Sequence, residues 1–194
     1  MRTNCLNLIV FCILCFSYAQ EAKHRPLLKT TNWGSEFFDF PIKFAPTIPY
    51  KGYEEAVFPK GWSNKESIEF WSYAFAWKIE KTIDLSPQDL ELQLEAYFDG
   101  LMNIKNIKNG VSILPTKVSF KSPINNLNNE FLGAVYLYEG RYNKQMMLLY
   151  TKVSLLYCEN KTRLILLFKF SPLDFNSLIW EVLDDITVLN DHCE

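Results

Sequence analysis

The sequence predicts an α+β protein in which two helices pack against an antiparallel sheet of about five strands, in the order β-α-β-β-β-β-α. Three observations support this prediction. Four apolar segments in the second half of the chain are separated by short polar turns, which is typical of antiparallel strands. A segment near the middle begins with a helix-capping sequence and continues with apolar residues at helical spacing. A second segment of this kind lies close to the C-terminus.

The composition indicates a single domain over residues 20–194. Of the 194 residues, 48% are hydrophobic and 22% are charged, so the chain can bury one substantial core and is not a disordered protein. The formal net charge is −2. Because a nucleic-acid-binding domain normally carries a basic stripe, we expect no nucleic acid among the partners.

Residues 1–19 have the organisation of a cleavable signal peptide. Arg2 precedes the apolar run 5–16, and Ser17-Tyr18-Ala19 places small residues where a signal peptidase reads them. As a helix the apolar run would span about 18 Å, which is too short for a hydrocarbon core of about 30 Å. We therefore expect an exported, periplasmic or secreted protein that is cleaved before Gln20, with no transmembrane segment after cleavage.

Residues 20–62 are predicted to form a long, mostly irregular arm that is rich in aromatic residues. Proline recurs along it, and Trp33, Phe58 and Trp62 are among its many rings; a disordered linker would not contain so many. A short strand is expected within residues 38–44. Two interpretations remain open: the rings pack on the core, or they form a surface that stacks on a ligand.

Residues 69–79 are predicted to form a strand. Large apolar side chains alternate along this segment, on one side of it: Trp71, Tyr73, Phe75, Trp77 and Ile79. A competing signal is the sequence Ser63-Asn64-Lys65-Glu66, which resembles a capping box and would begin a helix that continues through Trp77. The density of aromatic and β-branched residues favours the strand.

The first helix is predicted to begin at Ser86, which is followed by proline at the first helical position and by Asp89 at the third. It is expected to end before Gly110, because glycine tolerates the backbone conformation that terminates helices. Glu91 and Glu95 are one helical turn apart and are expected to belong to a solvated stripe.

The rest of the chain is predicted to add four strands and a second helix. The strands are expected over residues 111–121, 131–139, 145–158 and 163–170. The last two are apolar on both faces, as in central strands that are covered on both sides. Asp174 or Asn176 is expected to cap the final helix.

Two cysteines, Cys158 and Cys193, remain after the predicted cleavage. In an oxidising compartment they can form one disulfide; the alternative is a buried, reduced Cys158 and a free Cys193 in the tail. Neither belongs to a C-x-x-C pair, and the only histidines, His24 and His192, lie near the two ends. We therefore predict no metal site, no cofactor and no assignable catalytic residue.

Three short sequences carry a resemblance to a known group of proteins: FPKGW (58–62), WSYAF (71–75) and YFDGL (97–101). With them, about a third of the chain resembles uncharacterised exported proteins of Gram-negative bacteria. This resemblance implies a location in the cell envelope. It implies no activity, cofactor or catalytic residue.

The function that we expect is an exported, non-enzymatic binding or interaction module for a protein, glycan or lipid. Trp62, Trp71 and Tyr73 are the predicted ligand-binding residues, because large flat side chains stack on sugars and anchor protein partners. The alternative is a small carboxylate-dependent hydrolase of the envelope or extracellular space. An exposed aromatic patch would favour binding, whereas two carboxyl groups about 5–9 Å apart in a cleft would favour hydrolysis.

Overall fold

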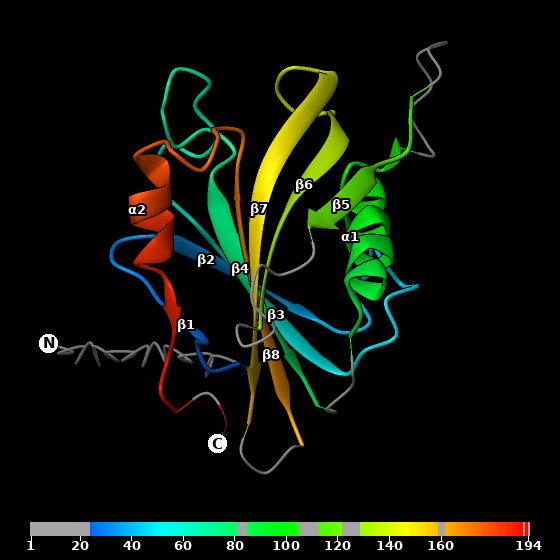
Figure 1. Ribbon diagram of the computed structural model, residues 1–194, viewed down its shortest axis with the longest axis vertical. Helices are drawn as coiled ribbons and strands as arrows, with labels where there is room; N and C mark the ends of the chain where they lie inside the picture. The colour runs from blue at the N-terminus through cyan, green and yellow to red at the C-terminus, as the bar shows by residue number, and fades with distance from the viewer. Residues whose placement is uncertain are drawn as a thin grey trace, which may run out of the picture.

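The computed structural model describes residues 24–80, 85–104, 113–121, 129–158, 162–191 and residue 193. The predicted signal peptide and His192 lie outside these residues. The elements follow one another in chain order (Figure 1): β1 (Leu28–Lys29), β2 (Gly34–Asp39), β3 (Gly52–Phe58), β4 (Tyr73–Ile79), α1 (Pro87–Leu101), β5 (Lys117–Lys121), β6 (Glu130–Glu139), β7 (Gln145–Tyr157), β8 (Leu164–Ser171), α2 (Ile179–Asp184) and β9 (Thr187–Val188).

Seven of these strands form one antiparallel sheet in the order β2-β3-β4-β8-β7-β6-β5, and β1 pairs with β9 in a small second sheet. The predicted combination of an antiparallel sheet and two helices is confirmed. The protein is mainly β, however, and its large sheet has seven strands rather than about five.

The additional strands of the large sheet come from the segment 20–62, for which the sequence predicts a mostly irregular arm; most of its described residues do lie outside strands. It contains β1, β2 and β3. The adjacent acidic residues Glu54 and Glu55 interrupt the apolar pattern of β3, although both are buried. The first half of β2 is polar and exposed because β2 is an edge strand. Neither strand therefore has the alternation by which half-buried strands are recognised.

The predicted strand within residues 69–79 is confirmed as β4, and the competing helix from Ser63 is wrong. Residues 61–70 form consecutive turns, in which Asn64 N–H donates to the Gly61 carbonyl and Ser67 N–H donates to the Asn64 carbonyl. Trp71 has a φ of 53° and donates its backbone N–H to the Trp62 carbonyl at 2.9 Å. This turn delays the start of the strand to Tyr73.

Helix α1 begins as predicted. Ser86 Oγ accepts from the Asp89 N–H at 3.1 Å, and the Asp89 carboxylate accepts from the Ser86 N–H at 3.0 Å, which is a complete capping box. The helix ends at Leu101; Gly110 lies outside the described residues. Its buried side chains, Leu90, Leu94, Tyr97 and Phe98, pack into the larger core on one side of the sheet.

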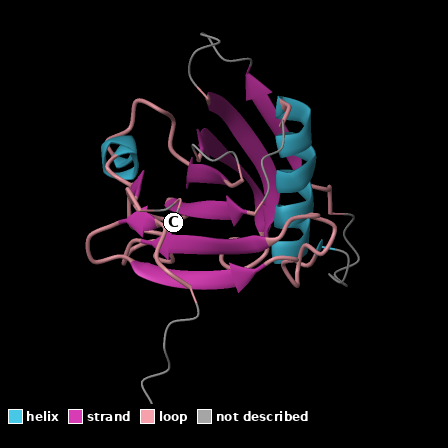
Figure 2. Ribbon diagram, turned by 90° about the horizontal axis from the view of Figure 1, so that it is seen from below, coloured by secondary structure: helices cyan, strands magenta, loops and turns pink. Residues whose placement is uncertain are grey.

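The two helices lie on opposite sides of the curved sheet (Figure 2). We call the side covered by α1 the inner face and the other side the outer face. The inner face carries an aromatic core that includes Phe75, Trp77, Phe168 and Phe170. On the outer face, a smaller core joins α2 and the segment around β1 to β4 and β8.

Helix α2 is shorter than expected and is not capped as predicted. Its N-cap residue, Leu178, offers no side-chain hydrogen bond. Asp174 instead accepts from the Asn176 N–H at 2.9 Å, in the turn that precedes the helix. Buried Ile179, Trp180 and Leu183 hold α2 on the sheet, so packing, rather than a cap, stabilises this short helix.

Three acidic side chains of α1 bind the free edge of β5, so the prediction of a solvated stripe at Glu91 and Glu95 is wrong. Backbone N–H groups of the β5 segment donate to Asp99, Glu95 and Glu91 in turn: Thr116 at 2.8 Å, Val118 at 3.2 Å and Phe120 at 2.8 Å. Successive acidic residues are four positions apart in the helix, which corresponds to a rise of about 6 Å. Successive N–H donors are two positions apart in the strand, which corresponds to about 6.7 Å. The two repeats therefore match, and carboxylates of α1 close the edge of the sheet; Figure 1 shows α1 beside β5.

We predict that Glu95→Leu lowers the free energy of unfolding by about 1 kcal/mol, because the Val118 N–H loses its acceptor. Glu95→Gln is the matched control, since the amide oxygen can still accept from Val118 while the charge facing Lys117 is removed. Urea denaturation of both variants measures the difference. Equal losses in the two would assign the effect to the ion pair with Lys117 instead.

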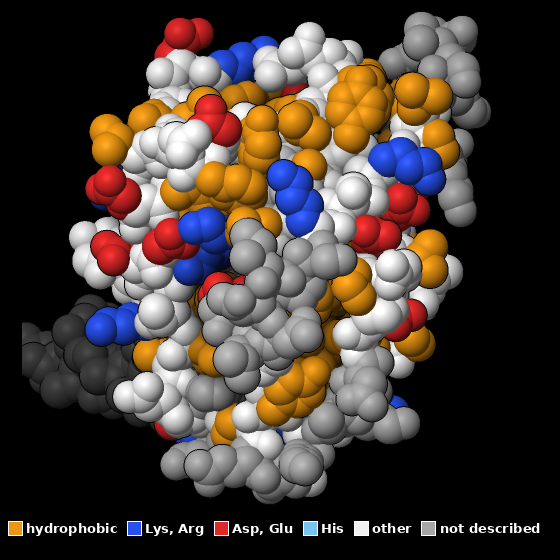
Figure 3. Space-filling model, viewed as in Figure 1, with side chains coloured by type: hydrophobic (Ala, Val, Ile, Leu, Met, Phe, Trp, Pro, Cys, Tyr) orange, Lys and Arg blue, Asp and Glu red, His pale blue; other side chains and the backbone are white. Residues whose placement is uncertain are grey.

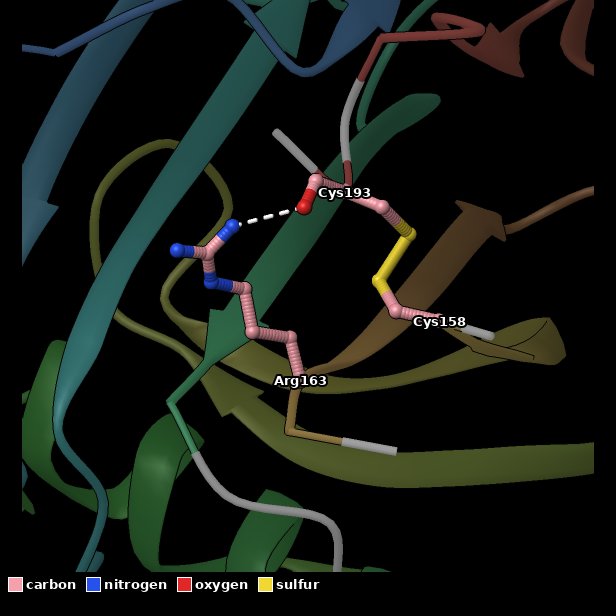
Figure 4. Close-up of a disulfide and its surroundings, with 3 residues drawn as sticks. All are labelled: Cys158, Arg163 and Cys193. Carbon is pink, nitrogen blue, oxygen red and sulfur yellow. Dashed lines mark hydrogen bonds between the residues drawn. A yellow bond between two sulfur atoms is a disulfide. The ribbon is translucent and has the colours of Figure 1, made fainter. Parts of the chain in front are cut away.

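Cys158 and Cys193 form a disulfide, as the first interpretation of the two cysteines predicts; their Cα atoms are 5.6 Å apart. Beside it, Arg163 donates from Nη1 to the Cys193 carbonyl at 2.6 Å (Figure 4). The tail that follows β9 is thereby attached to the ends of β7 and β8. A disulfide is consistent with an oxidising compartment. Within the described residues, no helix has the length and apolar character needed to cross a membrane.

Candidate functional site

The outer face of the sheet is covered over only part of its width. Helix α2 and the segment around β1 pack over β3, β4 and β8, and all eight residues of β8 are buried. On β6 and β7 the outward side chains are exposed or half-buried. The prediction that both of the last long strands are covered on both sides therefore holds for β8 and is wrong for β7.

Seven outward residues of β6 and β7 form an apolar surface that we call the open sheet face: Leu132, Ala134, Tyr136, Tyr138, Met146, Leu148 and Tyr150. The side chains that are most accessible are Leu132, Tyr136 and Leu148, with exposed fractions of 37%, 42% and 41%. On the side of the molecule drawn in Figure 3, hydrophobic side chains gather over the upper part of the sheet.

Strand pairing makes this surface continuous. Tyr136 lies opposite Leu148, Ala134 opposite Tyr150, and Tyr138 opposite Met146. Directly opposed residues of an antiparallel pair have their Cβ atoms about 5 Å apart. The register of β6 and β7 thus sets aromatic and aliphatic groups side by side in successive rows.

Lysines border the open sheet face on both sides. Lys117 and Lys121 lie on the neighbouring strand β5, opposite Tyr136 and Leu132. On the other side, Lys152 donates to Asp184 at 2.7 Å, with its Nζ 5.1 Å from the centre of the Trp180 ring. Carboxylates offset part of this positive charge: Lys117 lies 3.5 Å from Glu95, and Glu130 is exposed at the start of β6 on the same face.

Lys169 extends this border on β8. Its Nζ lies 3.6 Å from the Asp184 carboxylate, which it shares with Lys152. Burial lowers the pKa of Lys169, and the nearby Asp184 carboxylate opposes that shift. Asp184, the last residue of α2, thus forms ion pairs with two lysines.

The predicted ligand-binding residues Trp71 and Tyr73 are in the core, with exposed fractions of 1% and 3%. The Tyr73 ring stacks on Phe58 and Phe170, and Trp71 packs edge-on against Trp62. The expectation that Trp62 and Trp71 share a surface patch with Tyr73 is therefore wrong. Period two places them on one side of the segment but does not tell whether that side is covered.

Trp62 is half-buried. Its ring meets Trp71 and, at 6.0 Å, Tyr142 in the turn between β6 and β7. Its ring contacts are with residues of the inner-face core, and among the described residues none of its ring contacts is with the open sheet face. One sequence signal could have indicated the open sheet face. Within residues 131–150 both faces of the strands carry apolar side chains, and an apolar second face must either be covered by another element or bind a partner.

The buried carboxylates have partners within the protein. Glu54 accepts from Trp77 Nε1 at 2.7 Å and from the Tyr97 hydroxyl at 2.8 Å, and burial raises its pKa to about 7. Its neighbour Glu55 accepts from the backbone N–H groups of Leu27 and Leu28 across the opposite face. Adjacent strand residues point to opposite faces, so this pair cannot form the two-carboxylate centre of a hydrolase.

A third buried carboxylate, Glu139, closes the turn between β6 and β7. It accepts from the backbone N–H groups of Arg141, Tyr142 and Asn143. Its hydrogen bonds are local and hold the hairpin. They also account for why a fully buried acid is tolerated at the end of β6.

His24, the histidine among the described residues, packs against an aromatic ring and pairs with a carboxylate. His24 stacks on Tyr53 with ring centres 4.3 Å apart, and its Nε2 lies 2.8 Å from Asp39. Among the described residues, no cluster of His, Cys, Asp and Glu has the arrangement of a metal site.

Comparison with known proteins adds no assignment: no family model, no curated protein and no solved structure matches this chain.

Proposed function

We propose that this chain is an exported, non-enzymatic binding module that docks a protein partner on the open sheet face. The observation that carries the proposal is the exposure of Tyr136 and Leu148, which lie opposite each other, and of Leu132, two rows further along the same pair of strands. Contiguous exposed apolar surface of this kind marks interaction sites in proteins. The apolar run and cleavage sequence of residues 1–19 support export.

The chemistry of the surface favours a protein over a glycan or a lipid. A lipid chain is normally enclosed in a concave pocket, whereas these side chains stand in rows on a sheet. A sugar-binding platform presents aromatic faces among polar groups. Here the three tyrosines alternate with Leu132, Met146 and Leu148, a mixture that resembles the centre of a protein–protein interface.

The bordering charges indicate the character of the partner. Lys117 and Lys121 lie on one side of the apolar rows, and Lys152 lies on the other side, opposite Leu132. Charges at the rim of an interface select partners of opposite sign and accelerate association. We therefore infer a partner surface with apolar side chains at its centre and Asp or Glu around them.

A photo-crosslinking amino acid at position 136 tests this proposal in the native host. We expect a covalent adduct with one protein, attached at a peptide in which apolar side chains lie beside Asp or Glu. A second variant carries the crosslinker at position 92, because Leu92 is exposed on the solvent side of α1, away from the sheet. That variant should not give the adduct.

The matched substitutions are Leu148→Glu and Leu92→Glu, which place the same charge at two exposed leucines. Leu148→Glu should reduce the yield of the position-136 adduct at least about tenfold, whereas Leu92→Glu should leave it unchanged, with equal melting temperatures in both. An adduct that forms equally from positions 136 and 92, or that survives Leu148→Glu, would contradict the proposal.

A further inference from the structure

The two edges of the large sheet differ in how their backbone groups are satisfied. At the β5 edge, the outward N–H groups of Thr116, Val118 and Phe120 donate to carboxylates of α1. At the other edge stands β2. An edge strand with unpaired backbone groups is a template for pairing with another strand.

The ladder between β2 and β3 shows which groups of β2 point outward. Phe40 N–H donates to the Gly52 carbonyl, in register with the pairing of β2 and β3. Residues of an antiparallel pair alternate between exchanging hydrogen bonds and not doing so. The backbone N–H and carbonyl groups of the even-numbered residues of β2 therefore point toward β3. Those of Ser35 and Phe37 point away from it.

Within the described part of the chain, the N–H groups of Ser35 and Phe37 have no hydrogen-bond partner. No side chain of the described residues covers them in the way that Glu91, Glu95 and Asp99 cover β5. Among the described residues, the fold thus closes one edge of the sheet with carboxylates and leaves the N–H groups of Ser35 and Phe37 at the other edge without such a cover.

We propose that β2 pairs with β2 of a second copy of this chain, antiparallel and about a twofold axis at Phe37. The two sheets then join into one continuous sheet across the dimer. Each Phe37 N–H donates to the Phe37 carbonyl of the other copy, and Ser35 lies opposite Asp39. This surface is separate from the open sheet face, so the inference stands independently of the proposed function.

The charges and the proline near β2 select this register. An axis at Glu36 would set the two Glu36 carboxylates directly opposite each other, which is unfavourable. An axis at Phe38 would set Ser35 opposite Pro41, which has no N–H to donate. With the axis at Phe37, Glu36 lies opposite Phe38, and no two like charges face each other.

The side chain of Phe37 also favours a second copy as the occupant. Phe37 lies in an aromatic group with Tyr53 and His24, at ring-centre distances of 6.3 Å and 6.0 Å. The twofold axis would bring the two Phe37 rings, which are half-buried, side by side on the outer face. Aromatic pairs at opposed positions stabilise antiparallel strands.

Sedimentation equilibrium of the purified protein tests the proposal, with Ser35→Pro and Ser35→Ala as a matched pair. Proline removes the outward N–H and adds a ring at the edge, while the bonds from β2 to β3 remain; alanine keeps the N–H. The parent protein and Ser35→Ala should dimerise with similar dissociation constants. Ser35→Pro should raise the dissociation constant at least about tenfold.

A cross-linking experiment reports on the register without a proline. Cys158 and Cys193 are bonded to each other, so Phe37→Cys introduces a free thiol at the proposed axis. A short bifunctional maleimide should link two copies of Phe37→Cys, but not two copies of Lys117→Cys, whose thiol lies on the other edge strand. A parent protein that stays monomeric up to ~1 mM, or dimers unaffected by Ser35→Pro, would overturn the inference.

Discussion

Replacing Trp71 with alanine is expected to lower the free energy of unfolding by about 3–5 kcal/mol, which is the usual cost of truncating a buried Trp. The side chain is 1% exposed and packs against the rings of Trp62 and Tyr73. Its indole N–H has no hydrogen-bond partner within the described residues, so the loss comes from packing and from the cavity that remains. Urea denaturation followed by far-UV circular dichroism measures it.

Trp62→Ala is the matched control, because Trp62 lies in the same ring cluster but is only half-buried. We expect its loss to be no more than about half that of Trp71→Ala, since a partly exposed side chain leaves a smaller cavity. Equal losses in the two variants, or a Trp71→Ala protein as stable as the parent, would contradict the placement of Trp71 in the core.

The second large effect concerns the buried carboxyl group of Glu54. Burial raises the pKa of Glu54 from 4.5 to about 7, and the nearby Glu36 acts in the same direction, while the hydrogen bonds from Tyr97 and Trp77 oppose the shift. Between these two pKa values the folded protein holds a proton that the unfolded chain has released. Stability from this group is therefore fully present below pH 4.5 and is lost as the pH rises through 7.

The expected size of this loss is on the order of 3 kcal/mol, from a pKa shift of about 2.5 units at 1.36 kcal/mol each. Glu54→Gln is the control: its amide can accept from Trp77 and donate to the Tyr97 hydroxyl, and it does not titrate. We expect the parent protein to lose stability relative to Glu54→Gln between pH 5 and pH 8, measured by denaturation in urea. A constant difference between the two across this range would show that Glu54 does not titrate there.

The comparison of Glu54→Gln with the parent also separates Glu54 from Glu55. Burial raises the pKa of Glu55 as well, against the hydrogen bonds from Leu27 and Leu28, so Glu55 contributes to the pH dependence of both proteins in the same direction. The difference between the two proteins therefore reports on the side chain beneath α1 alone.

The parts of the fold that the sequence predicts correctly depend on local interactions. The capping box of α1 is complete within Ser86 to Asp89, and the period-two pattern of β4 is contained in its own seven residues. The strands β5 to β8 are separated by polar segments that can be recognised one at a time. Each of these signals is decided by neighbours a few positions away in the chain.

The errors arise where a long-range partner sets the role of a residue. Glu91 and Glu95 have the spacing of a solvated stripe, and only the position of β5 beside α1 turns them into acceptors for its backbone. Glu54 and Glu55 prevent β3 from being recognised as a buried strand in the sequence, because charged side chains normally avoid the core. They are tolerated there because Trp77, Tyr97 and the backbone near β1 supply donors.

The same reason explains the outcome for the predicted site. The sequence could identify Trp71 and Tyr73 as members of one side of a strand, but α1 and the neighbouring strands decided that this side is buried. It could not identify Tyr136 and Leu148 as surface residues, because their exposure depends on α2 covering β8 and contacting only part of β7. Which apolar face is left open is a property of the whole sheet.

The sequence by itself determined the start of α1, the strand character of β4 to β8 and the fact that Cys158 and Cys193 are the two cysteines available outside the predicted leader. The tertiary structure decided their pairing, the order of the seven strands, the burial of Trp71 and the exposure of the open sheet face. The physical reason is the range of the interactions. Caps and alternation act within a few residues, whereas burial depends on surfaces that meet only when distant segments pack together.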